Sequence, residues 1–341
     1  MKLTYDETAA GLYFDFAGIA DRGYAFNFII GGRGIGKTYG AFKYCQQRDK
    51  RFMYLRSGDP EWEMASNENT TPIRAHWSPL VIRKGKGAAA VFDGEFGADD
   101  KIIAGEQIGY TASLSTFKNM RGAELHAFYQ ESGGICIYDE FIRERSAKRT
   151  LKDEFDAFYN FYETAFREAP VQTFLFSNSV ELNSPILARL DLIRPIEYML
   201  IHHMDSWTDE TRSILIYLPH DIPITEVKRH TALNVLAAGT QAASSALDND
   251  FSYMDTHDVK REALQQYKPV CVTESDGCRI SMWQHKSDDR LYFARVNASA
   301  PKVTPALMRA AYQPLFRRAQ LLDKLRFDDY HLKIVVQDIL D

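Results

Sequence analysis

The stretch FNFIIGGRGIGKTYGAF, residues 26–42, decides the fold of this chain. It joins an apolar run typical of a buried strand to a glycine-rich turn and then to a segment with helical periodicity. The turn matches the pattern G-x-x-x-x-G-K-[ST], with Gly31, Gly36, Lys37 and Thr38 at the fixed positions. Glycines in such a turn let backbone N–H groups surround phosphate oxygens, and the helix points the positive end of its dipole at the same anion. The stretch therefore predicts a P-loop.

The residues of this loop have separate expected roles. Lys37 is expected to reach the β and γ phosphates of ATP, and the Thr38 hydroxyl is expected to bind Mg²⁺. The predicted phosphate cradle consists of Gly31, Gly32, Arg33, Gly34, Ile35, Gly36, Lys37 and Thr38. The alternative is a glycine-rich turn without a ligand, and the succession of strand, loop and helix makes it the weaker interpretation.

A second apolar strand ends in two carboxylates, in GGICIYDEF at residues 133–141. Asp139 is predicted to be the Walker B acid that holds the Mg²⁺ water shell. Glu140 follows directly, and a carboxylate at this position can orient the attacking water and accept its proton. The alternative, an acidic pair that caps the next helix, is weakened by the P-loop upstream.

A third strand, VQTFLFSNS at residues 171–179, is apolar until Ser177 and Asn178. In P-loop ATPases with an additional catalytic-glutamate strand, a polar residue at this tip touches the γ-phosphate or the attacking water. Asn178 is therefore a candidate catalytic residue. A turn-forming Ser-Asn pair is an equally open alternative.

The segment FDAFYNFYETAFREAP, residues 155–170, carries aromatic residues at helical spacing, which indicates a helix in the core or at an interface. Arg167 stands at the end of this segment. It can satisfy helix carbonyls there. In a ring ATPase it can instead reach the γ-phosphate of a neighbouring subunit and stabilise charge in the transition state.

The formal net charge is −5, so the overall basic signature of a nucleic-acid-binding protein is absent. One basic segment, FIRERSAKRTLKDEF at residues 141–155, begins directly after the two acids. The predicted DNA contacts in it are Arg143, Arg145, Lys148 and Arg149. We expect them to bind the phosphate backbone in a pore, the alternative being a solvated helix start with ion pairs to neighbouring acids.

The length of 341 residues favours two domains, or one domain with a substantial appendix. A composition of 45% hydrophobic and 26% charged residues is typical of a globular protein. No run of 18 or more apolar residues predicts a membrane span. Acidic residues in the stretch MKLTYDETAAGLYFDF disfavour a signal peptide, so we expect a cytoplasmic protein without a membrane partner. The four cysteines lack zinc-site spacing and are expected to be free thiols.

Taken together, these motifs resemble those of a known family. NFIIGGRGIGKTYGAF, ICIYDEFIRER and FLFSNSVELNSP are similar to stretches of the DNA-packaging (encapsidation) ATPases of small podophages, the phi-twenty-nine type. The resemblance is clearest through residues 26–186. It implies an α/β fold in which a P-loop ASCE ATPase domain with a central, mostly parallel sheet is followed by a helical linker. A small α+β domain then follows, similar to an RNase H-type nuclease that has lost its catalytic acids.

The expected boundaries are 1–219 for the ATPase domain, 220–250 for the linker and 251–341 for the C-terminal domain. Residues 57–105 match the family poorly and are rich in Gly, Asp and Pro, so we interpret them as a lid-like insertion. A hairpin is predicted inside it, turning at residues 85–87. The Ala-rich composition of the linker favours helix.

By this resemblance, ATP hydrolysis with Mg²⁺ moves double-stranded DNA into a viral procapsid. Arg167 matches the family's arginine finger acting in trans, and Lys118, in STFKNMRG, falls near a second trans-acting basic position. The resemblance implies a homo-oligomeric ring, expected to be a pentamer. The ring is expected in the host cytoplasm, docked at the portal vertex of the procapsid, with a structural RNA as an optional partner.

Two alternatives stay open. The first is a packaging enzyme with an active nuclease, since Glu274, Asp276, Asp288 and Asp289 supply carboxylates in the C-terminal part. Acids at strand ends and in turns are solvated by default, and the resemblance argues against a live site. The second alternative is a P-loop module that binds nucleotide as a switch without turnover, against which Glu140 argues.

Overall fold

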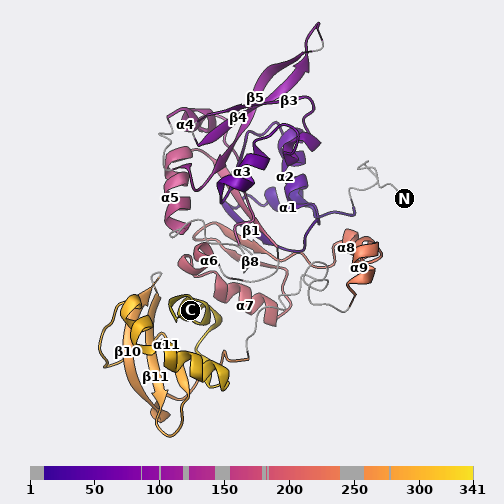
Figure 1. Cartoon of the computed structure of the whole chain (residues 1–341). Coiled ribbons are helices and arrows are strands. Elements are labelled where there is room, and N and C mark those ends of the chain that lie inside the picture. The colour runs from indigo at the N-terminus through magenta and orange to yellow at the C-terminus, as the bar shows by residue number, and fades with distance from the viewer. Residues whose placement is uncertain are drawn as a thin grey trace. The chain divides into compact units, whose positions relative to one another are not determined.

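The structure is a computed structural model of the chain, drawn as a ribbon in Figure 1. The residues that it describes are 11–85, 87–99, 101–117, 123–142, 154–178, 182, 184–238, 257–275 and 278–340. The chain forms two compact units. Unit 1 contains residues 1–181 and 202–252, and unit 2 contains residues 182–201 and 253–341.

These units differ from the expected domain ranges at two places. Residues 182–201 lie inside the range 1–219 that was expected for the ATPase domain, yet they belong to unit 2. Residues 220–250, expected as a separate linker, are grouped with unit 1. The first difference has a physical reason, because a helix in 182–201 forms ion pairs and hydrogen bonds with the C-terminal part of unit 2, as described below.

Unit 1 is built on a sheet that has nine strands within the described residues. In chain order they are β1 (Phe26–Ile30), β2 (Phe52–Arg56), β3 (Leu80–Lys84), β4 (Ala88–Phe96), β5 (Ile102–Ser113), β6 (Gly134–Asp139), β7 (Val171–Ser177), β8 (Ser206–Asp209) and β9 (Ile214–Tyr217). Their order across the sheet is β3-β4-β5-β2-β6-β7-β1-β9-β8. From β5 to β9 in this order the strands pair in parallel, whereas β3, β4 and β8 pair antiparallel. The predicted α/β fold with a mostly parallel sheet is confirmed.

The order of the central strands positions the predicted acids. β7 lies between β1, which leads into the P-loop, and β6, which ends at Asp139. Carboxyl ends of parallel strands meet at one edge of a sheet, so the P-loop, Asp139 and the tip of β7 share that edge. Residues 28–30 of β1 are at most 1% exposed, as expected for a strand covered on both faces.

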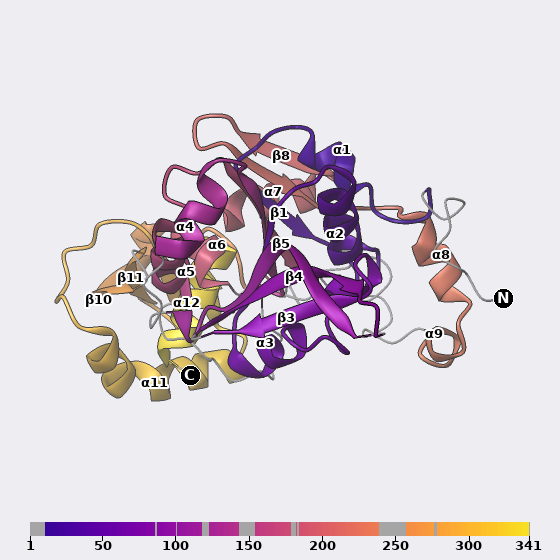
Figure 2. The same ribbon diagram turned by 90° about the horizontal axis from the view of Figure 1, so that it is seen from above.

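Unit 1 has seven helices in the part of the chain that the structure describes. They are α1 (Phe16–Ala20), α2 (Lys37–Gln47), α3 (Asp59–Ala65), α4 (Ala123–Gln130), α5 (Glu154–Ala165), α8 (Pro223–Arg229) and α9 (Ala232–Leu236). In both views α1 and α2 lie on one side of the central strands, and α4 and α5 lie on the other (Figures 1 and 2). Phe42 of α2 is buried and packs its ring against Phe52 and Trp77, with centroids 5.2 and 6.4 Å away.

The aromatic stripe predicted for residues 155–170 lies on α5. Phe158 and Phe161 are buried, and Phe158 stacks on Tyr138 of β6 with ring centroids 5.8 Å apart. Tyr159, on the other hand, is 55% exposed. The stripe is therefore largely core, and one aromatic side chain stays at the surface.

The insertion near residues 57–105 extends the sheet beyond β5. It contains α3, a short 3-10 helix η2 (Pro72–Ala75), β3, β4 and the first residues of β5. A hairpin forms as predicted, since β3 ends at Lys84 and pairs antiparallel with β4, which begins at Ala88. The Gly85 N–H donates to the Ala88 carbonyl at 2.8 Å. Three strands, β2, β6 and β7, separate β5 from the P-loop strand. A role of the insertion as a lid stays a prediction.

Unit 2 combines a small sheet with four helices in the part that the structure describes. The strands, in the order in which they pair, are β10 (Tyr267–Ser275), β11 (Cys278–His285), β12 (Leu291–Ala294) and β13 (Leu325–Phe327). The helices are α6 (Pro185–Arg189), α7 (Ile193–Ile201), α11 (Pro305–Leu321) and α12 (Tyr330–Leu340). β10 to β12 form an antiparallel meander, and β13 pairs in parallel with β12. The α+β character is as predicted, and the finer likeness to RNase H-type nucleases stays a prediction.

The acids considered for a nuclease have different surroundings. Asp288 pairs with Arg290 at 2.9 Å, and Asp289 pairs with Arg318 at 3.0 Å. Glu274 is exposed, and Asp276 lies outside the described residues.

Among the helices that the structure describes, none has the length and apolarity that a membrane span requires.

A polar cluster around the buried Asp329 holds α7 in unit 2. Arg194 of α7 pairs with Asp329 at 3.0 Å, and Glu197 accepts a hydrogen bond from the backbone N–H of Tyr330 at 3.1 Å. Burial raises the pKa of Glu197 to about 7, and the negative charge of Asp329 adds to the increase. The folded unit therefore holds a carboxyl group that resists ionisation.

We predict that Glu197→Gln stabilises unit 2 above pH 7 and has little effect near pH 4.5. A folded-state pKa above the unfolded value means that the folded chain binds more protons between these pH values, so stability falls as pH rises through this window. Gln keeps an acceptor for the Tyr330 N–H without a charge. At 1.36 kcal/mol per pKa unit, the gain above pH 7 is roughly 1–3 kcal/mol. Thermal unfolding from pH 4.5 to 8 measures it.

The matched control is Glu274→Gln, which changes an exposed acid of the same unit. This variant is expected to follow the wild-type stability profile. A Glu197→Gln protein whose stability parallels that of the wild type at every pH would contradict the assignment.

Candidate nucleotide-binding site

The P-loop has the backbone that its glycines predict. It connects the end of β1 to the start of α2, and Gly34 and Gly36 adopt positive φ values of 64° and 96°. A Cβ atom at Gly36 would also lie 3.0 Å from the ring of Tyr13. Only glycine accepts this backbone without strain, so the loop keeps its N–H groups available for an anion.

Lys37 is buried at the base of the loop. Its Nζ atom donates to the carbonyl oxygens of Gly31 at 2.8 Å and Gly32 at 2.9 Å. Burial lowers the pKa of Lys37 to about 8, and the nearby charge of Asp139 opposes this shift. A buried ammonium group held by two neutral carbonyls would gain from an anion, which fits the predicted phosphate contact.

Asp139 connects the P-loop with two further strands. The Thr38 hydroxyl donates to its Oδ2 atom at 2.9 Å, and the Tyr54 hydroxyl of β2 donates to the same atom at 3.0 Å. Thr38 and Asp139, predicted together as metal ligands, are thus adjacent although 101 positions separate them. An alcohol and a carboxylate oxygen are the hard ligands that suit Mg²⁺.

Arg56 is a part of the site that the sequence did not assign. It ends β2, the strand beside β6, and its Nη2 atom lies 2.5 Å from Oε2 of Glu140 while Nη1 lies 3.5 Å from Oδ2 of Asp139. The Arg56 side chain is 13% exposed and that of Glu140 is 52% exposed. Glu140 also has a positive φ of 58°, which is uncommon for a residue other than glycine. A basic residue at the end of the apolar run FMYLR, residues 52–56, was the signal that the sequence offered.

Asn178 directly follows β7 and is half-buried. Ile30 pairs with Ser177, so Asn178 lies at the register of Gly31, where the P-loop begins. The backbone N–H of Gly31 donates to the Ser177 carbonyl at 3.1 Å and ties the two strand ends together. The position agrees with the predicted role beside the phosphates, and the role itself stays a prediction.

Arg167 lies at the opposite edge of the sheet. It is exposed, has a positive φ of 49° and precedes the amino end of β7, where Val171 pairs with Gly134. The P-loop is at the carboxyl end of the same strands, about 20 Å away along β7 at 3.3 Å per residue. Arg167 cannot span this length to the loop of its own chain. Its expected role as an arginine finger acting in trans stays a prediction.

The remaining predicted residues lie outside the described part of the chain. They are Lys118, Arg143, Arg145, Lys148 and Arg149. Their assignments as trans-acting and DNA-binding residues stay predictions.

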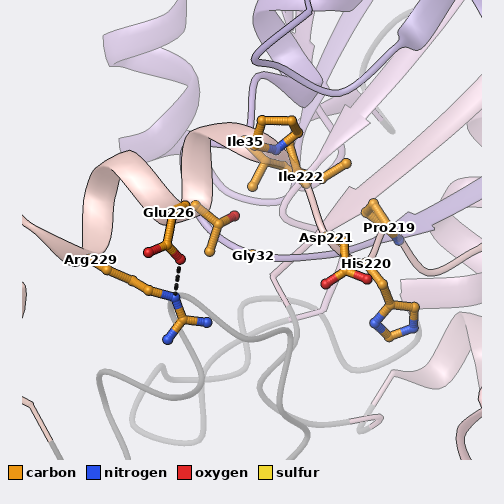
Figure 3. A pocket seen from close by; sticks show the side chains of 10 residues that line it. Gly32, Ile35, Pro219, His220, Asp221, Ile222, Glu226 and Arg229 are labelled. Carbon is orange, nitrogen blue, oxygen red and sulfur yellow. Dashed lines mark ion pairs between the residues drawn. The ribbon is translucent and has the colours of Figure 1, made fainter.

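A cavity of about 400 Å³ adjoins the loop, and the sequence did not indicate it. It is lined by Gly32 and Ile35 of the loop and by residues between 219 and 229 (Figure 3). Glu226 and Arg229 of α8 form an ion pair at 3.1 Å at its rim. Lys228 donates a hydrogen bond from Nζ to the carbonyl oxygen of Arg33 in the loop.

Comparison with known proteins gives relatives and structural neighbours. The DNA packaging protein of Bacillus phage PZA is 25% identical over 271 residues, which is 78% of this chain and 74% of that protein. The DNA packaging protein of Bacillus phage B103 is 26% identical over 287 residues, 82% of this chain and 81% of that protein.

The solved structures agree on the fold. A chain of the Phi-28 gp11 DNA packaging motor has a TM-score of 0.63 at 15% identity and covers 97% of this chain and 98% of its own. A chain of the bacteriophage Phi-29 viral genome packaging motor assembly has a TM-score of 0.60 at 17% identity, with 96% and 98% covered.

The family model of the Podovirus DNA encapsidation protein (Gp16) matches residues 9–337 of this chain. The match covers nearly the whole chain and confirms the resemblance that the sequence motifs indicated. The chain therefore belongs to the podovirus DNA encapsidation protein (Gp16) family.

Proposed function

We propose that this chain is the ATP-hydrolysing subunit of a motor that moves double-stranded DNA into a viral procapsid. The observation that carries the proposal is the hydrogen bond between Thr38 of the P-loop and Asp139, with Glu140 next to it. These groups are what phosphoryl transfer to water requires: a phosphate cradle, a metal-binding pair and a carboxylate for the water. Family membership and the packaging proteins among its relatives supply the DNA substrate of the proposal.

The site residues fit ATP and Mg²⁺. Lys37 would contact the phosphates, and Thr38 and Asp139 would hold Mg²⁺, which supplies charge neutralisation on the phosphate oxygens. Glu140 would orient the water and accept its proton, and Asn178 would contact the γ-phosphate or that water. Because Glu140 is ion-paired with Arg56, it has to leave this cation to act as a base.

We predict that Glu140→Gln keeps ATP binding and lowers the rate of hydrolysis about 100-fold or more. Removal of a general base typically costs this much in rate, and Gln leaves the phosphate cradle intact. Calorimetric ATP titration and phosphate release measure the two effects. Glu131→Gln, an exposed acid before the other end of β6, is the matched control and should behave as wild type. Unchanged turnover in Glu140→Gln would remove this residue from the mechanism.

Arg167 is proposed as an arginine finger that acts on the neighbouring subunit in a ring. We predict that Arg167→Ala leaves the ATP affinity of an isolated subunit unchanged and abolishes turnover in the assembly, since such a finger contributes about 10³–10⁵ in rate. Mixing Arg167→Ala with Lys37→Ala subunits should restore hydrolysis, because some interfaces then combine an intact loop with an intact Arg167. If no mixture hydrolyses ATP faster than either variant alone, Arg167 does not act in trans.

DNA contact is proposed for the basic segment after the acids. Neutralising Arg145, Lys148 and Arg149 together should preserve basal hydrolysis, stop packaging and flatten the salt dependence of DNA binding. The log–log slope should fall by up to about 0.9 for each DNA phosphate that the protein no longer neutralises. Filter binding across a salt series and packaging into procapsids measure these effects.

A second variant keeps this test specific. Neutralising the exposed Arg309 and Arg317 removes two positive charges from α11. If the segment at residues 141–155 binds the DNA, this control variant should package DNA normally. A triple variant in that segment that packages DNA normally would contradict the assignment. Loss of basal hydrolysis would instead place the segment in the nucleotide site.

The finer parts of the proposal are the assembly and its place in the cell. They comprise a pentameric ring, a portal vertex in the host cytoplasm, an optional structural RNA and Lys118 as a second trans-acting residue. Negative-stain images of the protein on procapsids test ring size and place. Plasmid nicking with Mg²⁺ or Mn²⁺ distinguishes a packaging enzyme with an active nuclease, and the absence of phosphate release would favour a nucleotide switch.

A further inference from the structure

The cavity beside the P-loop has a wall that follows directly from the sheet order. β9 pairs with β1 on the side away from β7, so the chain leaves β9 at the carboxyl edge, next to the start of the loop. Pro219 lies so close that a Cβ atom at Gly31 would be 2.4 Å from its Cγ atom. The glycine at position 31 thus serves this contact as well as the loop backbone.

The wall is fixed in place by packing and hydrogen bonds. Ile224 of α8 is buried in the core cluster that also contains Ile35 of the loop, and its N–H donates to the Leu12 carbonyl at 2.8 Å. Lys228, on the same helix, donates a hydrogen bond to the carbonyl oxygen of Arg33. The α8 segment is therefore attached near both of its ends, and the space between it and the loop is a defined cavity.

The lining of the cavity matches a nucleoside better than a phosphate. The side chains of Ile35, Pro219, Ile222 and Pro223 form its apolar part, and polar side chains form the rest. The polar members are His220, Asp221, Thr225, Glu226 and Arg229. A flat base needs apolar surface for its faces and a few polar groups at its edges and for the ribose hydroxyls. The volume of about 400 Å³ is within the usual range for small ligands.

Lys228 places a second positive charge near Lys37. Burial is the main cause that lowers the pKa of Lys37, and the positive charge of Lys228 contributes in the same direction. The two ammonium groups, bonded to carbonyl oxygens of consecutive loop residues, thus repel one another. A phosphate chain between the loop and α8 would relieve this repulsion, which gives Lys228 a reason to stand beside a triphosphate.

We propose that residues 219–229 form the nucleoside-binding wall of the P-loop site, with base and ribose in this cavity and Lys228 beside the phosphates. The inference rests on the proposed function, because it assumes that the loop binds a nucleoside triphosphate. It assigns base and ribose recognition to a segment that was expected, from residue 220 on, to be a linker.

The test compares ATP with inorganic tripolyphosphate, which has the phosphates and lacks the nucleoside. Wild-type protein with Mg²⁺ is expected to bind ATP at least about tenfold more tightly by calorimetry, because only ATP fills the cavity. Thr225→Trp places a large ring in the cavity and is expected to remove this tenfold advantage while leaving the tripolyphosphate affinity unchanged. Val227→Trp is the matched control, since Val227 is on the same helix, 41% exposed and not part of the lining.

Lys228→Met gives a second arm that does not depend on filling the cavity. It is expected to weaken ATP and tripolyphosphate alike by about threefold to tenfold, as loss of one phosphate cation does. Equal wild-type affinities for ATP and tripolyphosphate would overturn the proposed wall, and so would a Thr225→Trp protein that retains the full preference for ATP. Lys37→Ala tests the proposed ATP site itself. If this variant binds both ATP and tripolyphosphate as tightly as the wild type, the P-loop is not the phosphate site.

Discussion

The carboxylate of Asp139 is the point on which the geometry of unit 1 depends. Three side chains from two parts of the chain converge on it: the Thr38 hydroxyl from the P-loop, and the Tyr54 hydroxyl and the Arg56 guanidinium from β2. A mostly buried carboxylate costs several kcal/mol unless such partners compensate it. The contacts therefore fix the loop, β2 and β6 relative to one another at the edge where a triphosphate would bind.

The sequence predicted those parts of the site that a fixed spacing defines. Gly36, Lys37 and Thr38 follow from a short motif, and Asp139 follows from an apolar strand that ends in acids, because both patterns are local. Arg56 and residues 219–229 could not be assigned in the same way. Their roles arise from strand order, which places β2 beside β6 and β9 beside β1, and order depends on long-range packing.

The fold was predictable to a similar degree. Buried parallel strands appear in a sequence as continuous apolar runs, so the central sheet was expected, and the hairpin at residues 85–87 was indicated by its glycines. The sequence did not predict that the C-terminal unit also includes residues 182–201. The apolar face of α7 and its polar residues, Arg194 and Glu197, give no local sign that their partners are Asp329 and Tyr330.

The composition of unit 2 from two separate stretches has a consequence for work with fragments. A C-terminal fragment that starts at residue 253 would lack α6 and α7 and so would leave Asp329 without Arg194. It would also lack Ile193, Ile196 and Met199, which are fully buried in the intact chain. A covalent fusion of 182–201 to 253–341, or co-expression of the two pieces, would retain these contacts, whereas a cut placed by sequence boundaries alone removes them.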